Sequence, residues 1–260
     1  MKALKSFLLF FSMVFVLVFS QSVYAWTIAD DPTGGDCTSI GIWKVYTKTC
    51  ILQTDLSEGI VINSDNISLQ CYGHSITYDP LDWPPAYYYG IEVLGRNGVT
   101  VRYCAISGFE GGILVSDSNN ITLQGNSITS MSVGIEVSSS GNNTLQGNTV
   151  HAAIGNGIVL SSSNDNTLKD NTSDGNGGGS GIYLSYSDNN TLRGNTCNSN
   201  NGVGFLLNYS NNNYLSKNTA DYNDFFGYVI NGNDITLRRN ECLGNFEGGS
   251  LPLGLCSPQQ

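Results

Sequence analysis

The sequence predicts one all-β domain in which the chain coils as a parallel β-solenoid. Three observations lead to this prediction. Apolar and polar residues alternate in short segments, which is the period of a strand and not of a helix. The pattern returns every 22 to 24 residues along the chain. Gly, Asn and Ser separate the segments, and no segment is long enough for a crossover helix. Turns stacked about 4.8 Å apart then form ~8 to 9 rungs.

Two sets of residues recur in step with this repeat. A glycine precedes an apolar–any–apolar segment at Gly90, Gly112, Gly134, Gly157, Gly181, Gly204 and Gly227. An apolar residue follows Thr, Ser or Tyr at Leu69, Val101, Leu123, Leu145, Leu168, Leu192, Leu215 and Leu237. Since a solenoid places equivalent residues of successive turns above one another, each set is expected to form one column along the axis.

A third column consists of asparagines three residues after six of those leucines. Its members are Asn126, Asn148, Asn171, Asn195, Asn218 and Asn240. An amide side chain both donates and accepts hydrogen bonds, so stacked copies can bond from rung to rung where water is excluded. The fixed offset therefore predicts an asparagine ladder at a bend of the coil.

The two ends of the chain depart from the repeat. Residues 1–25 have the order of a secretory signal, because Lys2 and Lys5 precede an apolar run and small residues precede Ala25. That run is too short for a membrane span, so no transmembrane anchor is expected in the mature chain. Residues 26–62 are expected to form an N-terminal cap and first rung, residues 63–245 the β-helix repeats, and residues 246–260 a C-terminal cap or tail.

Export predicts an oxidising compartment, in which cysteines pair. We expect the disulfides Cys37–Cys50, Cys71–Cys104 and Cys242–Cys256 from the positions of these residues in the caps and in successive rungs. Cys197 shares a column with Cys242 but is two rungs away, about 9.6 Å by strand spacing, which is beyond disulfide reach. It is expected to be a buried thiol.

The charges are unevenly distributed. The chain has 11 basic and 21 acidic residues and a formal net charge of −10, which argues against a nucleic-acid partner. Most acids fall in turns, whereas basic residues follow the leucine column and point outward by alternation. The basic set comprises Arg102, Lys169, Arg193 and Arg238. These cations either offset nearby Asp residues on a solvated face or form an edge that binds an anionic polymer such as a uronic acid polysaccharide.

An insertion interrupts the repeat. The step from Leu69 to Val101 is 32 residues long, and the extra length lies in an inserted loop over residues 78–89. Aromatic rings with polar rims on a long loop suit a sugar or a protein partner; the alternative is that the rings fold back onto the coil. The candidate binding residues are Asp79, Asp82, Trp83, Tyr87, Tyr88, Tyr89 and, from a neighbouring turn, Phe109.

No catalytic cluster is evident, and the catalytic residues remain unknown. Outward-facing Glu92 and Glu136 share a column and are separated by Leu114, so two rungs place them about 9.6 Å apart. That separation suits an inverting glycosidase but is easily met by chance. We expect no metal site and no cofactor; a calcium ion near Asp174, where a run is similar to a calcium-binding repeat, is the alternative left open.

Two stretches carry a family resemblance. Residues 65–77 read Asp-Asn-Ile-Ser-Leu-Gln-Cys-Tyr-Gly-His-Ser-Ile-Thr, and residues 97–109 read Asn-Gly-Val-Thr-Val-Arg-Tyr-Cys-Ala-Ile-Ser-Gly-Phe. They resemble the opening rungs of NosD-like proteins, related in fold to pectate lyases. The resemblance covers roughly residues 37 to 245 and implies a right-handed parallel β-helix. It implies no one function, since the same repeat occurs in lyases, epimerases, copper-site accessory proteins and adhesins.

A shorter resemblance concerns the insertion. Asp79-Pro80-Leu81-Asp82 is similar to the Asp-Pro-His-Asp motif of mannuronan epimerases, but Leu81 replaces the catalytic histidine. The first functional hypothesis is therefore an exported or cell-surface protein that binds carbohydrate or another surface partner without catalysis. The alternatives are a polysaccharide-active lyase, hydrolase or epimerase, and a NosD-like periplasmic accessory protein.

Overall fold

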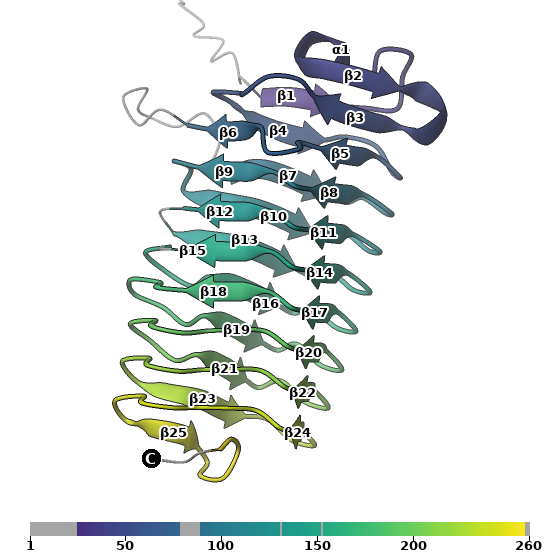
Figure 1. Cartoon of the computed structure of the whole chain (residues 1–260). Coiled ribbons are helices and arrows are strands. Elements are labelled where there is room, and N and C mark those ends of the chain that lie inside the picture. The colour runs from purple at the N-terminus through teal and green to yellow at the C-terminus, as the bar shows by residue number, and fades with distance from the viewer. Residues whose placement is uncertain (1–24, 79–88, 131, 152, 258–260) are drawn as a thin grey trace, which may run out of the picture.

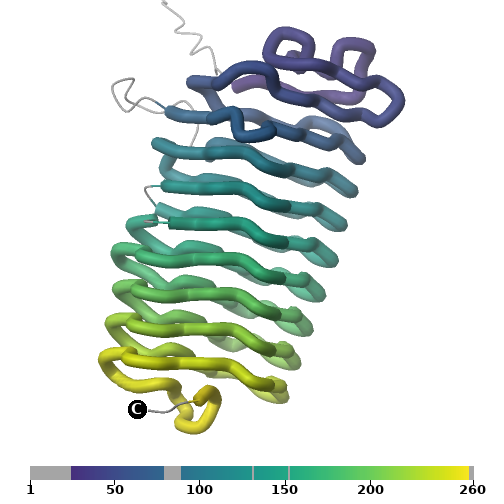
Figure 2. The backbone as a smooth tube through the Cα atoms, viewed as in Figure 1, coloured from purple at the N-terminus to yellow at the C-terminus, as the bar shows by residue number. Residues whose placement is uncertain are grey.

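The structure, a computed structural model, is a parallel β-helix of about eight turns (Figure 1). It describes residues 25–78, 89–130, 132–151 and 153–257. Each turn contributes a strand to two long sheets, and five turns also contribute to a shorter third sheet. The smooth backbone trace shows the turns stacked one on the next along a single axis (Figure 2). The predicted fold class is therefore confirmed.

Sheet A is the longest face of the coil. In spatial order it consists of β1 (Ala25–Ile28), β4 (Gly59–Ile62), β7 (Tyr89–Leu94), β10 (Gly111–Ser116), β13 (Val133–Ser138), β16 (Ile158–Ser161), β19 (Ile182–Ser185), β21 (Phe205–Asn208), β23 (Phe226–Asn231) and β25 (Gly248–Leu251). All its pairings are parallel, and the register aligns Ile91, Ile113 and Ile135, as the glycine motif predicts.

Sheet B follows sheet A within each turn. It consists of β2 (Gly41–Lys44), β3 (Thr49–Leu52), β5 (Ser68–Gln70), β8 (Thr100–Arg102), β11 (Thr122–Gln124), β14 (Thr144–Gln146), β17 (Thr167–Lys169), β20 (Thr191–Arg193), β22 (Tyr214–Ser216) and β24 (Thr236–Arg238). Its register runs through the predicted leucine column from Leu69 to Leu237.

Sheet C closes the coil over its first half. It consists of β6 (Ser75–Thr77), β9 (Ala105–Ser107), β12 (Ser127–Thr129), β15 (Thr149–His151) and β18 (Thr172–Asp174). The N-terminal end is covered by the short helix α1 (Cys37–Ile40), the 3-10 turn Val45–Thr47 and the antiparallel pair β2–β3. The described part of the chain contains no helix long and apolar enough to span a membrane.

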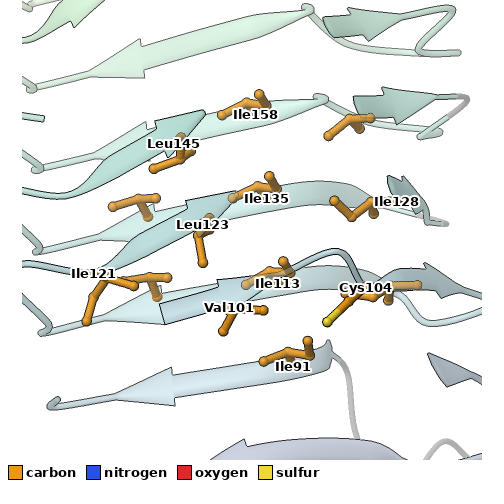
Figure 3. Close-up of a cluster of buried hydrophobic side chains, with 14 of the residues drawn as sticks. Ile91, Val101, Cys104, Ile113, Ile121, Leu123, Ile128, Ile135, Leu145 and Ile158 are labelled. Atoms are coloured by element: carbon orange, nitrogen blue, oxygen red, sulfur yellow. The ribbon is translucent and has the colours of Figure 1, made fainter. Parts of the chain in front are cut away.

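Inward-facing aliphatic residues of the sheets form one continuous core. Figure 3 shows successive layers, with Val101, Leu123 and Leu145 aligned from rung to rung. Each of these side chains is fully buried, and burying such a residue contributes roughly 1.5–3 kcal/mol. The repetition of the same apolar contact explains how a coil with many polar turns stays folded.

Amides and hydroxyls occupy buried corners. In the predicted ladder, Asn148 donates from Nδ2 to Oδ1 of Asn171 at 3.0 Å and to the carbonyl of Leu123 at 2.9 Å. Sequence analysis missed three further ladders. They comprise Asn143, Asn166, Asn190 and Asn213; Asn176, Asn200, Asn223 and Asn245; and Ser118, Ser140, Ser163, Ser187 and Ser210.

The cysteines pair as expected. The structure contains the disulfides Cys37–Cys50, Cys71–Cys104 and Cys242–Cys256. Cys197 is a buried free thiol, and burial raises its pKa. The signal peptide expected over residues 1–25 lies almost entirely outside the described residues and stays a prediction.

Candidate functional site

The outer face of sheet B carries the cations that the sequence places on one edge. The strand register aligns one outward column as Gln70, Arg102, Gln124, Gln146, Lys169, Arg193, Ser216 and Arg238. A second outward column contains Ser68, Thr100, Thr122, Thr144, Thr167, Thr191, Tyr214 and Thr236. Neither column contains a carboxylate, so the face combines positive charge with hydroxyl and amide groups in a protein that is acidic as a whole.

Most of these cations lack an acidic partner. Lys169 lies 3.6 Å from Asp170, which is the next residue in the chain. Within the described ranges, Arg102, Arg193 and Arg238 form no ion pair, and the Nε atom of Arg102 is buried without a hydrogen-bond partner. Of the four cations, only Lys169 therefore lies within ion-pair distance of a carboxylate among the described residues.

A second group of functional side chains lies on the outer face of sheet A. Register places Glu92 and Glu136 in one column with Leu114 between them. The phenol of Tyr89, two rungs from β13, donates a hydrogen bond to Oε2 of Glu136. This contact is possible because Gly111, which separates Tyr89 from Val133 in the register, has no side chain: a Cβ there would be 2.2 Å from the Tyr89 ring.

The tyrosine borders a small hollow. Tyr89, Glu110, Gly111, Ser132 and Val133 line a cavity of about 170 Å³. Burial, followed by the hydrogen bond to Glu136, raises the pKa of the Tyr89 phenol, and burial also raises the pKa of Glu92. Tyr89 therefore stays protonated as a hydrogen-bond donor and is a weaker acid than an exposed tyrosine, whereas Glu92 takes up a proton at a higher pH than an exposed glutamate. Of these two pKa shifts, only that of Glu92 is in the direction that suits a general acid.

The structure joins residues that the sequence suggested separately. Tyr89 was expected from the insertion and Glu136 from the carboxylate column, and their hydrogen bond places them at one site. Sequence analysis missed Glu110, because it lies in a turn outside the repeating columns. Phe109 is a correction: it is 1% exposed and packs against Tyr78 at 5.7 Å between ring centroids, so it supports the coil and cannot offer its ring to a ligand.

The remaining insertion candidates cannot be placed. Asp79, Asp82, Trp83, Tyr87 and Tyr88 lie outside the described residues. Their proposed role in binding therefore stays a prediction, and so does any chemistry at the Asp79-Pro80-Leu81-Asp82 segment.

The two histidines do not come together in a metal site. His74 lies 3.3 Å from Asp55 on the first turns, whereas His151 lies beside Asp174 on sheet C. The buried thiol of Cys197 lies in a later turn. No group of three or more His, Cys, Asp or Glu residues in the described ranges is arranged to hold a metal ion. Copper sites in proteins are built from His, Cys and Met ligands, and the described residues do not fit such a site.

The fold and the side chains on its outer faces define a parallel β-helix protein with extended polar surfaces. The chain belongs to the NosD family: the family model described as "Periplasmic copper-binding protein (NosD)" matches residues 57–250. The family is thus a periplasmic one, and the three disulfides agree with a location outside the cytoplasm. No curated protein matches the chain significantly.

Solved structures of an alginate epimerase show the same fold. The crystal structure of the periplasmic alginate epimerase AlgG superposes with a TM-score of 0.51 and 20% identity, covering 75% of this chain and 57% of that one. A variant of the same epimerase gives a TM-score of 0.53 with 20% identity, covering 76% and 61%. The enzymatically active domain of bacteriophage CBA120 tailspike protein 2 gives 0.48 with 13% identity, covering 76% and 37%. The chain thus spans about three fifths of the epimerase it resembles.

Proposed function

We propose that this protein binds an acidic polysaccharide along the outer face of sheet B, outside the cytoplasm, without cleaving it and without a cofactor. The observation that carries the proposal is the absence of carboxylates from the two outward columns between β5 and β24. Four aligned cations, Arg102, Lys169, Arg193 and Arg238, lie there among side chains that are otherwise Gln, Ser, Thr and Tyr.

The arrangement suits an extended anion. Cations in one column are separated by whole rungs of about 4.8 Å, so a linear polymer lying along the axis meets them in succession. Gln amides and Thr hydroxyls between the cations donate and accept hydrogen bonds, as sugar hydroxyls require. Meanwhile Glu92 and Glu136 on sheet A, and Glu110 in the turn before β10, gather around Tyr89, where they repel the same polymer. The charge pattern therefore favours one face over the other.

Binding measurements on polygalacturonate test this proposal. The quadruple Gln variant of Arg102, Lys169, Arg193 and Arg238 should bind at least about tenfold more weakly and show a smaller salt dependence, because exposed charge pairs are screened by salt. The control carries Gln at Lys44, Lys48 and Arg96, which lie away from the four aligned cations and from the turns that follow them. It is compared with the triple Gln variant of Arg102, Arg193 and Arg238, so that both variants change the net charge equally. Equal losses in both variants would show that only net charge matters and would contradict a dedicated face.

A second candidate function rests on the Tyr89–Glu136 hydrogen bond. With Glu92 two rungs away, these groups could supply the acid and base of a polysaccharide hydrolase acting on sheet A, and the hollow beside Tyr89 would receive the sugar. Release of reducing ends from neutral polysaccharides, lost in the Glu136→Gln variant, would support it. Lyase, epimerase and NosD-like accessory roles have no comparable arrangement among the described residues.

A further inference from the structure

A column of turn residues borders sheet B at the point where each strand ends. Its eight members all have left-handed backbone: Tyr72, Tyr103, Gly125, Gly147, Asp170, Gly194, Lys217 and Arg239. Glycine and aspartate are ordinary at such positions, whereas a bulky ring is disfavoured there by its Cβ. The φ values of Tyr72 and Tyr103 are 48° and 58°. Every residue of this column shares this backbone conformation, so the rings of Tyr72 and Tyr103, and not their backbone, set these two positions apart.

The two rings form an exposed pair. Tyr72 and Tyr103 stack with their centroids 6.1 Å apart, and they are 61% and 42% exposed. The ring of Tyr103 also lies over the next turn, because a Cβ at Gly125 would be 2.8 Å from it. The stack therefore ends in an aromatic surface that extends along the axis toward Gly147.

The next residue of this column, Gly147, has no side chain to occupy its place on the surface. A Cβ built there has no atom within 4 Å. The following side chain, Asp170, reaches away toward Gly194, where a Cβ would be 2.5 Å from its Oδ1 atom. The surface at Gly147 is therefore open, while the ring of Tyr103 covers Gly125 in the turn before it and Asp170 occupies the turn after it. We call this open position the Gly147 notch.

Polar side chains of sheet B flank this notch. Gln124 and Gln146 immediately precede Gly125 and Gly147 in the chain, and Arg102 and Lys169 precede Tyr103 and Asp170. The two cations are three rungs apart, about 14 Å by strand spacing. Aromatic surface, amides and cations are thus present on neighbouring columns of the same four turns.

We propose that the Gly147 notch is a subsite for one hexuronate ring of an acidic polysaccharide, stacked on Tyr103 and held by Gln124 and Gln146. This inference rests on the proposed function of sheet B and names its ligand class. The apolar face of a pyranose packs on an aromatic ring, and an amide pairs with neighbouring hydroxyls as donor and acceptor. The Arg102 guanidinium binds a carboxylate. A polyanion without sugar rings would use the cations alone.

Two probes separate ring recognition from charge. Tetragalacturonate carries carboxylates on pyranose rings, whereas inorganic polyphosphate of similar charge has no rings. Their dissociation constants are measured by calorimetry with the full chain. Tyr103→Ala removes the aromatic wall, and Gly147→Tyr fills the notch in a backbone conformation that Tyr103 itself adopts.

Each variant has a matched control on another corner of the coil. Tyr209 is likewise exposed and left-handed and stacks on Tyr186 at 5.2 Å, so Tyr209→Ala controls for loss of a surface tyrosine. Gly95 has a φ of 64° and no atom within 4 Å of a Cβ, so Gly95→Tyr controls for Gly147→Tyr. Far-ultraviolet circular dichroism confirms that all four variants fold.

Tyr103→Ala and Gly147→Tyr should each weaken tetragalacturonate binding about tenfold. Polyphosphate binding should be unchanged, and both control variants should bind like the original chain. Unchanged tetragalacturonate binding in both notch variants, together with a loss in the Arg193→Gln variant, would overturn the subsite but leave sheet B as the binding face. Equal losses for both probes would also overturn the subsite, and no binding of either probe to the original chain would overturn both proposals.

Discussion

The corners of the coil are filled by different kinds of residue in the first turns and in the later turns. At the corner before sheet B, the residue is Ile67, Val99 or Ile121 in the first three turns and then Asn143, Asn166, Asn190 or Asn213. At the corner after sheet B, Cys104 occupies one turn and Asn126 the next. The backbone N–H of Cys104 donates a hydrogen bond to Oδ1 of Asn126 at 3.1 Å. The apolar corners are filled by packing, whereas the amide corners are joined by hydrogen bonds.

The two kinds of corner differ in what they tolerate. An amide ladder requires every rung to hold the same register, since each Asn bonds to the one above and the one below. Packed apolar corners accept side chains of different size, and a disulfide replaces the ladder at Cys71–Cys104. The inserted segment, the Tyr89–Glu136 contact and the Tyr72–Tyr103 pair all lie in or beside the apolar-cornered turns. The insertion and the contact across two rungs therefore occur where the corner does not require a repeated amide, whereas a stacked surface pair such as Tyr186–Tyr209 also occurs beside the ladders.

The largest difference in stability between the two regions is expected when an asparagine in the middle of a ladder is replaced. Asn195→Ala removes an acceptor for the N–H and Nδ2 of Asn171 and a donor to the carbonyl of Leu168. Leaving these three groups unpaired should cost about 3–9 kcal/mol, at about 1–3 kcal/mol each. Val99→Ala, at an apolar corner, should cost about 1–2 kcal/mol. Urea unfolding compares the two, and equal costs would show that the ladder adds nothing beyond packing.

The disulfide in the apolar-cornered turns should contribute somewhat less. Replacing Cys71 and Cys104 by Ala removes a link between residues 33 apart, which should lower the free energy of unfolding by about 3 kcal/mol. Cys197→Ala, a change to a buried thiol without a bond, is the control and should cost about 1–2 kcal/mol. Thermal unfolding under non-reducing conditions measures both, and a larger loss at Cys197 would contradict this ranking.

Extending the ladder by one rung gives a smaller change. Ile121 already donates its N–H to Oδ1 of Asn143 at 2.7 Å, so an Asn at position 121 would join the existing column. Ile121→Asn should therefore cost only about 1 kcal/mol, because new hydrogen bonds offset the lost burial. Leu123→Asn, in the neighbouring apolar column, has no ladder to join and should cost more than about 3 kcal/mol. Similar costs at both positions would show that the two columns are equivalent.

The smallest effect concerns pH. Burial raises the folded-state pKa of Glu92, so its contribution to stability is fully present below its unfolded pKa and is lost as pH rises through the folded value. Glu92→Gln should remove this loss. The difference in unfolding free energy between the variant and the original chain should therefore favour the variant more at pH 7 than at pH 4. Exposed Glu247→Gln is the control. Unfolding free energies measured across this pH range would contradict the assignment if both variants behaved alike.

Part of the molecule could be predicted because periodicity carries the information. The spacing of Leu69 to Leu237, the Asn126–Asn240 ladder and the cysteine positions all follow from one repeat, since a solenoid converts equal sequence intervals into vertical alignment. The aligned cations on sheet B follow for the same reason. These features require only the knowledge that the turns stack, which the alternation of apolar residues supplies.

The contacts between columns were decided by the tertiary structure alone. Tyr89 reaches Glu136, the Tyr103 ring covers Gly125, and Phe109 turns inward. A repeat length states which residues align along the axis, but it holds no information about the angle at each corner or the direction in which a side chain leans across it. Those depend on the packing of neighbouring turns, and they determine which surface side chains can act together.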